Sequence, residues 1–283
     1  MQTIYSIDHC LHQGIELANG AISDSFDKPL RVETVLARIK ASDLGDVISP
    51  RVFDRRFYAA VHSERYVDFL ASAWEEWRAT GRTCQALPHV WPIRAMPSSN
   101  EQPISVEGKL AFFSMDACAP INAGTWAAVS ASANTALTGA DAVASGALAA
   151  FALCRPPGHH AGREYTGGYC YLNNAAIAAQ HAIGHGAKRV AIIDIDFHHG
   201  NGTQDIFYDR SDVLFVSIHG EPSGAYPYFS GYADERGIGA GAELNLNVPL
   251  PKGTRWATYK KRWISPVRPS RRTRQILSSF RSE

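Results

Sequence analysis

The sequence contains few cysteines and no two of them at C-x-x-C spacing. Its 283 residues include five cysteines, an odd number, scattered from Cys10 to Cys170. This pattern argues against a disulfide framework and indicates reduced thiols in a cytoplasmic protein.

Long hydrophobic runs are also missing. The longest weakly polar tract, residues 126–154, is rich in alanine but is interrupted by Asn134, Gly139, Asp141 and Gly146, so it is not expected to span a bilayer. The first residues lack a basic segment leading into an apolar region, so no secretory signal is expected. A membrane is therefore not among the expected partners.

Net charge is nearly absent, although the charges are unevenly distributed. The formal net charge is +1. Residues 260–283 hold eight Lys or Arg and one acid, which leaves a body of 20 basic and 26 acidic residues, with a net charge of about −6. An acidic body favours the approach of a small cationic substrate, but such a balance is also ordinary for soluble proteins.

The sequence does contain enough apolar residues for a large core. With 45% hydrophobic residues, a chain of this length is expected to form one α/β domain. Short apolar runs alternate three times with helical patterns, which predicts a parallel sheet with right-handed crossovers. The expected strands are residues 3–6, 147–154, 189–193 and 213–218, and the expected helices are residues 32–41, 61–77, 125–137, 174–183 and 203–208.

Two features of this pattern indicate where the function lies. The run 189–193 is largely apolar, as expected of a strand buried on both faces. Loops that follow parallel strands share one edge of the sheet, so the segments around His159, Asp196 and His219 are expected to converge. Residues 84–104 contain four prolines and are expected to form a long irregular segment, a type that is often functional or mobile.

Charged side chains gather directly after the strand expected at 189–193. Two aspartates and two histidines lie within positions 194–199, and a buried unpaired carboxylate is costly, so such charges normally have a metal or a partner. Asp196 and His198 can point to one side and bind zinc through oxygen and nitrogen, although a third ligand is needed. An Asp-x-His pair alone is more often a hydrogen-bonded strand end. The full Asp-x-Asp-x-His-His-Gly pattern is much more specific for a metal.

His159 and His160 form a second pair of titratable groups, reached through a Pro-Pro-Gly turn that fixes the backbone. Taken alone, a tandem histidine is sometimes only a solvated loop. With Asp194 and Asn201 expected nearby, each imidazole would have a partner that fixes its tautomer. We interpret the pair as candidate general acid and base beside a metal-bound water.

Four segments carry motifs of a known enzyme family. They are RPPGHHA at residues 155–161, GGYCYLNNAA at 167–176, DIDFHHGNG at 194–202 and SIHG at 217–220. Together they resemble the zinc-dependent histone deacetylase superfamily and, within it, bacterial acetylpolyamine amidohydrolases. The resemblance extends from the N-terminus to about Tyr259.

The resemblance implies an arginase-like three-layer α/β/α fold and hydrolysis of an N-acetyl amide. Asp196 and His198 would be zinc ligands. His160 would act as general base and acid, with His159 as its electrostatic partner. Asp194 would lie behind His159. Asn201 would lie behind His160.

The resemblance also implies how substrate and potassium bind. Gly168 would accept a hydrogen bond from the substrate amide, and Tyr169 and Tyr226 would wall the channel for an acyl-lysine-like or polyamine chain. Glu107 would meet a distal ammonium or, equally, be a surface acid. A structural potassium ion would be held by the backbone carbonyls of Asp194, Asp196 and His198 together with Ser217 and Ile218.

The family pattern breaks after Tyr259. A second aspartate ligand and a tyrosine on a downstream Gly-Gly-Tyr loop, which stabilises the oxyanion in the family, are both missing. Residues 260–283 have no apolar periodicity, and we interpret them as a frameshifted or truncated reading rather than a true basic tail for nucleic acid or nuclear import. The catalytic domain would then be residues 1–259 and incomplete. It would expose apolar strand edges and bind zinc weakly.

The leading hypothesis is a zinc amidohydrolase that acts on acetylated polyamines or similar small N-acyl amines. Deacetylation of acetyl-lysine in proteins is the alternative within enzymes, because the motifs define the reaction and not the leaving amine. A catalytically inert fragment is the alternative of another class. Arginase-like dimanganese chemistry is disfavoured because it needs more aspartates. The expected partner is a small cationic acetylated amine; nucleic acid is not favoured, and a homodimer remains open.

Overall fold

The computed structural model describes residues 1–18, 20–93, 96 and 100–264. The chain divides into two compact units, Met1–His181 and Ala182–Glu283, where its composition predicted one domain. In the described part of the chain, no helix combines the length and apolar character needed to cross a bilayer.

The first unit is built around a parallel sheet with strand order β4-β1-β5. Its strands are β1 (Gln2–Ile4), β4 (Val47–Ile48) and β5 (Ala150–Ala152), and Thr3 pairs with both Val47 and Phe151. A separate antiparallel hairpin joins β2 (Ile15–Ala18) to β3 (Ala21–Asp24). The parallel pairing confirms the predicted class, although strand β5 is shorter than the predicted run 147–154.

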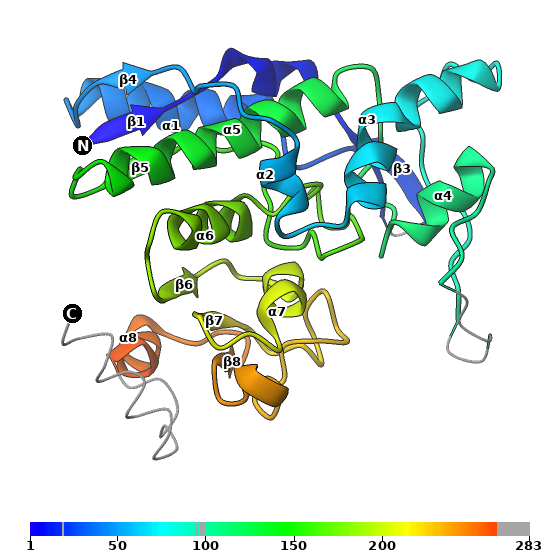
Figure 1. The fold of residues 1–283 in the computed structure, drawn as a ribbon. Helices are drawn as coiled ribbons and strands as arrows, with labels where there is room; N and C mark the ends of the chain where they lie inside the picture. Colours follow the sequence, from blue (N-terminus) through cyan, green and yellow to red (C-terminus); the bar gives the residue numbers. More distant parts are fainter. Residues whose placement is uncertain (19, 94–95, 97–99, 265–283) are drawn as a thin grey trace. The chain divides into compact units, whose positions relative to one another are not determined.

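Helices cover both faces of this sheet (Figure 1). Helix α1 (Pro29–Ala41) buries Val32, Leu36 and Ile39 against Phe151 and Leu153. Helix α5 (Thr125–Ala144) covers the opposite face, where a Cβ placed on its Gly139 would lie 3.6 Å from the side chains of Ile4 and Ala152. Neighbouring strand residues point to opposite faces, so Phe151 meets one helix and Ala152 the other. This is the three-layer arrangement that the resemblance implied.

One error of the sequence interpretation concerns the end of this helix. A helix ending near Gly139 was expected, but α5 continues to Ala144. Gly139 is buried in α5 beside the sheet, so tertiary packing of the helix outweighs the poor helix propensity of glycine. The other elements of this unit are η1 (Ile7–Leu11), α2 (Arg56–Ala59), α3 (Glu64–Ala79), α4 (Val106–Phe112) and the start of α6 (Asn174–Gly184).

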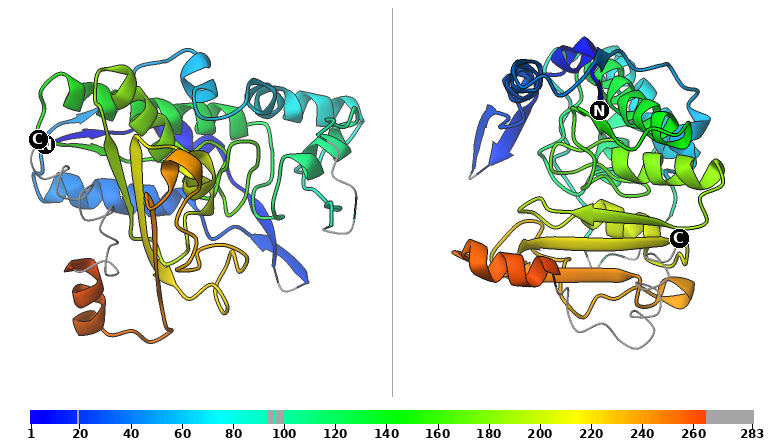
Figure 2. Two further views of the ribbon diagram at one scale, coloured as in Figure 1. Left: turned by 60° about the horizontal axis from the view of Figure 1, so that its bottom comes forward. Right: turned by 90° about the vertical axis from the view of Figure 1, so that its left-hand side faces the viewer.

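The second unit holds three parallel strands in the order β6-β7-β8 (Figure 2). They are β6 (Val190–Asp194), β7 (Val213–Gly220) and β8 (Asn245–Leu250). Helices α7 (Asn201–Phe207) and α8 (Trp256–Ile264) and the short η2 (Gly239–Gly241) complete the described part.

The two faces of this sheet differ in polarity. Leu214 and Val216 of β7 pack with Leu246 on one face, where Tyr259 of α8 also contacts the neighbouring cluster. On the other face, Asn245 and Asn247 both donate to Oε1 of Gln204 in α7, at 2.8 Å. Strand β8 was not predicted, although its Asn-Leu-Asn-Val alternation is the pattern of a strand between an apolar and a polar layer.

The expectation that the run 189–193 is buried was wrong. In β6 intermediate and exposed residues alternate, and Ile193 is 56% exposed. The reason is its position: among the described strands of the second unit, β6 pairs only with β7 and forms the edge of the sheet.

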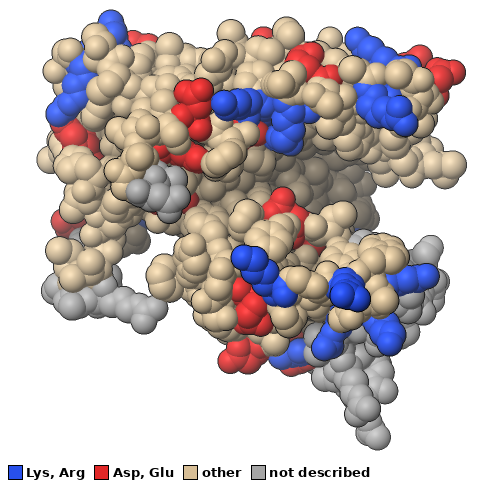
Figure 3. Space-filling model, turned by 180° about the vertical axis from the view of Figure 1, so that it is seen from behind, with Lys and Arg blue, Asp and Glu red and all other residues tan. Residues whose placement is uncertain are grey.

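Two further predictions fall partly outside the described residues. The boundary proposed at residue 259 lies inside α8, and residues 265–283 of the predicted tail are outside the described part. The proline-rich segment 84–104 contains no helix or strand among its described residues, but 94–95 and 97–99 are outside them. On the face shown in Figure 3, acidic and basic side chains are interspersed.

Candidate functional site

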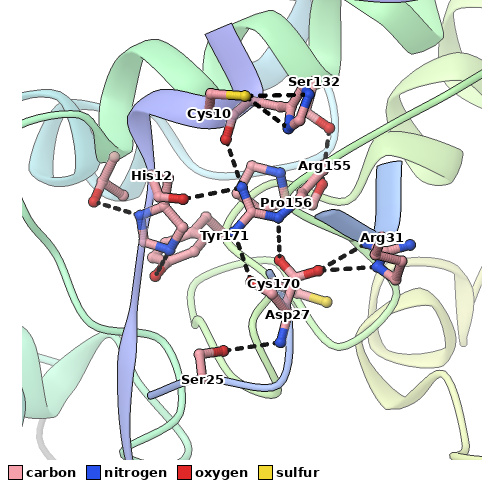
Figure 4. Close-up of polar contacts among 12 residues, drawn as sticks. Cys10, His12, Ser25, Asp27, Arg31, Ser132, Arg155, Pro156, Cys170 and Tyr171 are labelled. Atoms are coloured by element: carbon pink, nitrogen blue, oxygen red, sulfur yellow. Dashed lines mark hydrogen bonds and ion pairs between the residues drawn. The ribbon is translucent and has the colours of Figure 1, made fainter. Parts of the chain in front are cut away.

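The loop that carries the histidine pair is anchored at its start by Arg155. This side chain is buried, and its Nη1 donates to the carbonyls of His9 (2.5 Å) and His12 (2.9 Å). Its Nη2 donates to the Asp27 carbonyl at 2.6 Å, and its Nε lies 3.1 Å from the Asp27 carboxylate (Figure 4). A buried charge with this many partners is stabilising only while all of them are present, so the loop start is fixed in place.

The turn that follows requires glycine. A Cβ on Gly158 would lie 2.5 Å from the Asn174 nitrogen and 2.8 Å from the Leu172 carbonyl oxygen. The same turn is held through the Pro156 carbonyl, which accepts from Ser132 Oγ at 2.8 Å. The backbone is therefore packed tightly just before the two imidazoles.

The rings of His159 and His160 lie against each other, with centroids 4.0 Å apart and planes tilted by 43°. His160 is buried, whereas His159 is partly exposed. A buried imidazole in contact with a more exposed one is an arrangement that a histidine pair could use in general acid–base catalysis. The structure thus brings these two predicted residues together within the first unit.

His62 supports the same loop, and the sequence interpretation missed this role. It lies before α3, not within a helix starting at 61 as expected, and is fully enclosed. Its Nδ1 lies 2.9 Å from the Gly162 carbonyl, and its Nε2 accepts from the Asn173 amide at 2.9 Å, so the ring is neutral with its proton on Nδ1. Burial lowers the pKa of His62 to about 4.

Gly168 and Tyr169 are held by two acids that the sequence interpretation also missed. The Gly168 amide donates to Asp116 Oδ2 at 2.9 Å, and the Tyr169 hydroxyl donates to Glu16 Oε2 at 2.5 Å. Tyr169 has a positive φ of 68°, which a non-glycine residue adopts only when its surroundings enforce it. Burial, followed by the Glu16 hydrogen bond, raises the pKa of Tyr169 well above its ordinary value.

Asp194, Asp196 and His198 form a chain of local hydrogen bonds in the second unit. The Asp196 amide donates to Asp194 Oδ1 at 3.0 Å, and the His198 amide donates to Asp196 Oδ1 at 2.7 Å. Side-chain acceptors that bind the amide two residues later are typical of aspartate turns. The hydrogen-bonded strand end considered for Asp-x-His is therefore present, and it also fixes the direction of both side chains.

The pair fits two corners of a zinc site. His198 Nδ1 lies 3.4 Å from Asp196 Oδ1, and the side chains are 43% and 52% exposed. Two ligands at about 2.0–2.1 Å from a tetrahedral zinc are roughly 3.3 Å apart. Within the described residues, however, the pair belongs to no group of three His, Cys, Asp or Glu side chains with ligand atoms within 4.8 Å of one another. Among the described residues, Asp196 and His198 are thus two candidate ligands, one fewer than a catalytic zinc uses.

Other predicted residues of the second unit lie near these two. The Tyr226 ring packs edge-on against His198, with centroids 5.7 Å apart. Asp194 and Ser217 are direct partners in the β6–β7 register, and Ile218 follows, which brings the residues of the predicted potassium site side by side. Asn201 is buried at the start of α7.

Glu107 lies in the first turn of α4 and is paired. Its Oε1 is 2.7 Å from Nη2 of Arg82. The carboxylate thus has the surroundings of a surface acid, which was one of the two expectations for it.

The comparisons with known proteins agree with the motifs. A model of the histone deacetylase domain matches residues 25–275. The chain belongs to the histone deacetylase family. This confirms the resemblance, and it places the deacetylase fold on both units, because the matched range includes strands from each.

Within the histone deacetylase family, this chain is similar over most of its length to acetylpolyamine amidohydrolases. Acetylpolyamine amidohydrolase 2 of Pseudomonas aeruginosa is 54% identical over 269 residues, which cover 95% of this chain and 78% of that protein. The crystal structure of acetylpolyamine aminohydrolase from Burkholderia pseudomallei has a TM-score of 0.88 at 40% identity, covering 96% of this chain and 79% of that one. Histone deacetylase 8 of Arabidopsis thaliana is 45% identical, but over 137 residues, 46% of this chain.

Proposed function

We propose that this chain is a zinc-dependent amidohydrolase that removes acetyl groups from acetylated polyamines or similar small N-acyl amines. The observation that carries the proposal is the 54% identity over 95% of the chain to an acetylpolyamine amidohydrolase. The sequence match to Histone deacetylase 8 of Arabidopsis thaliana covers 46% of the chain, about half as much, so the protein-directed alternative has less support from sequence similarity.

The proposed proton transfer uses the histidine pair of the first unit. His160, buried and in contact with the ring of its neighbour, would take a proton from the attacking water and return it to the leaving amine. His159 would stabilise the charge that its neighbour gains. The roles of Asp194 behind His159 and of Asn201 behind His160 are part of this proposal.

Asp196 and His198 would hold the zinc ion, with a third ligand still needed. When bound, zinc polarises the acetyl carbonyl and lowers the pKa of water. The two side chains contribute a carboxylate oxygen and an imidazole nitrogen at a separation that suits tetrahedral zinc. A site with two protein ligands is expected to bind the ion weakly, so activity should depend on added zinc. We also propose that Asp194, Ser217 and Ile218 hold a structural potassium ion.

Four residues are proposed to contact the substrate. Gly168 would accept a hydrogen bond from the amide, and Tyr169 and Tyr226 would flank the aliphatic chain. Glu107 would meet a distal ammonium only after leaving Arg82, because that ion pair at 2.7 Å now occupies its carboxylate. We therefore expect Tyr169 and Tyr226 to contribute more to substrate selection than Glu107.

An inert chain is the second candidate, and the two-ligand site favours it. The test is acetate release from N-acetylputrescine and from an acetyl-lysine peptide, with zinc added. We expect faster release from N-acetylputrescine, and loss of release in the variant His160→Ala. No acetate from either substrate, while the Pseudomonas aeruginosa relative is active in the same assay, would establish the inert alternative. Sequencing the DNA around codon 260 separately tests the predicted frameshift.

A further inference from the structure

We propose that His9, Cys10 and Glu33 form a metal site for a soft divalent cation of the zinc class. His9 and Cys10 lie in η1, and Glu33 lies in α1, so all three belong to the first unit. Their ligand atoms, one nitrogen, one sulfur and one oxygen, all lie within 4.8 Å of one another. None of these residues has a role in the proposed deacetylation.

The distances between the ligand atoms suit a tetrahedral ion. Cys10 Sγ lies 3.5 Å from His9 Nε2, and His9 Nε2 lies 2.9 Å from Glu33 Oε1. Zinc bonds of about 2.3 Å to sulfur and about 2.0–2.1 Å to nitrogen and oxygen give edges of roughly 3.6 Å and 3.3 Å. The sulfur–nitrogen distance is close to this length, but Sγ also lies 3.8 Å from His9 Nδ1, so the Cys10 side chain has to turn toward the Nε2 side of the ring for both atoms to meet one ion. The nitrogen–oxygen edge has to open by about 0.4 Å, the change expected when a metal replaces a shared proton.

The donor set and its access to solvent support the same conclusion. Thiolate and imidazole together select zinc and similar soft or borderline ions over magnesium and calcium. His9 is buried, while Cys10 is partly exposed and the Glu33 side chain is 42% exposed, so an ion can reach the cluster from solvent. The small movement that the geometry requires falls on the Glu33 side chain, which is 42% exposed and hydrogen-bonded to Tyr5 and His9.

The cluster is fixed on its protein side. The carbonyl of His9 accepts from Arg155, and the Tyr5 hydroxyl donates to Glu33 Oε1 at 2.9 Å and lies 3.3 Å from His9 Nε2. Tyr5 thus stands beside the open corner of the site, where it or a water would complete the coordination.

Cobalt(II) titration of the full chain tests this proposal separately from the deacetylase site. A cobalt–thiolate bond gives a near-ultraviolet charge-transfer absorption that a site built only from Asp196 and His198 cannot give. We expect this absorption in the unmodified chain, its displacement by zinc, and its loss in Cys10→Ser. The matched control Cys84→Ser, which changes an exposed cysteine, should retain it, and so should the double variant Asp196→Asn with His198→Ala.

A second measurement needs no variant. Zinc should protect Cys10 from iodoacetamide in the unmodified chain, as followed by mass spectrometry, and leave the exposed Cys84 reactive. Absence of the charge-transfer absorption together with equal alkylation of Cys10 with and without zinc would overturn the proposal. An absorption that persists in Cys10→Ser would overturn it as well.

Discussion

Acidification should destabilise this protein through His62. The ring is fully enclosed and neutral, with its Nδ1 proton directed at the Gly162 carbonyl and its Nε2 accepting from the Asn173 amide. A second proton on Nε2 would face that amide donor and break the hydrogen bond. Burial of the charged ring is the main cost of protonation in the folded state, so the pKa of His62 falls to about 4 from its ordinary 6.5.

The sign and size of the effect follow from this difference. Between pH 6.5 and pH 4 the unfolded chain binds the proton and the folded chain does not, so the free energy of unfolding decreases as the pH falls through this window. Each pH unit corresponds to about 1.4 kcal/mol, so His62 alone should lower the free energy of unfolding by about 2 kcal/mol at pH 5. Above pH 6.5 its contribution is fully present.

Urea unfolding at pH 7 and pH 5, followed by tryptophan fluorescence, measures this loss. The variant His62→Asn keeps an amide that can donate to Gly162 but does not titrate, so it should lose about 2 kcal/mol less than the unmodified chain between these pH values. The control His89→Asn changes an exposed histidine and should keep the full loss. If His62→Asn and the unmodified chain lose the same amount, the buried neutral histidine is not the cause.

Two further substitutions test the support of the histidine loop. Gly158→Ala places a Cβ 2.5 Å from the Asn174 nitrogen, so it should lower the free energy of unfolding by about 2–3 kcal/mol. The thermal unfolding midpoint should fall as well, and an unchanged midpoint would contradict the close packing. Asp27→Asn removes the charge beside buried Arg155 and should lower the free energy of unfolding, measured with urea, by about 3–5 kcal/mol. The control Asp24→Asn, in an exposed ion pair, should lower it by less than about 1 kcal/mol. Equal losses would show that the Arg155 pair contributes no more than a surface ion pair.

Local sequence patterns predicted the architecture well because its elements are amphipathic. Helix α1 shows its apolar spacing at Val32, Leu36 and Ile39, and β7 begins with four consecutive apolar residues, 213–216, and is buried as a central strand should be. Burial of β6 was predicted wrongly from the same kind of run. A local sequence pattern can predict an apolar strand. Whether that strand is buried depends also on whether it has a neighbouring strand on each side, which the pattern does not indicate.

Some residues of the candidate site could be predicted from local sequence patterns, and others could not. Asp196 and His198 were visible because both are close in the sequence and their geometry comes from local amide hydrogen bonds. His62, Asp116 and Glu16 were not, because each acts on a residue about fifty or more positions away. No spacing rule connects such partners, and each of these side chains looks like an ordinary polar residue in its own segment.

The two parts of the proposed site are thus built to different degrees of rigidity. The histidine pair stands on a loop whose start, turn and end are fixed by buried contacts of Arg155, Gly158 and His62, so its geometry should persist without metal or substrate. Asp196 and His198 are about half exposed and are held by hydrogen bonds within five residues of chain. If this chain has low activity, we therefore expect the cause to be weak metal binding and not a misplaced histidine pair. Because the metal ligands are held less rigidly than the histidine pair, we expect the turnover rate to rise with added zinc and to saturate only at a high zinc concentration.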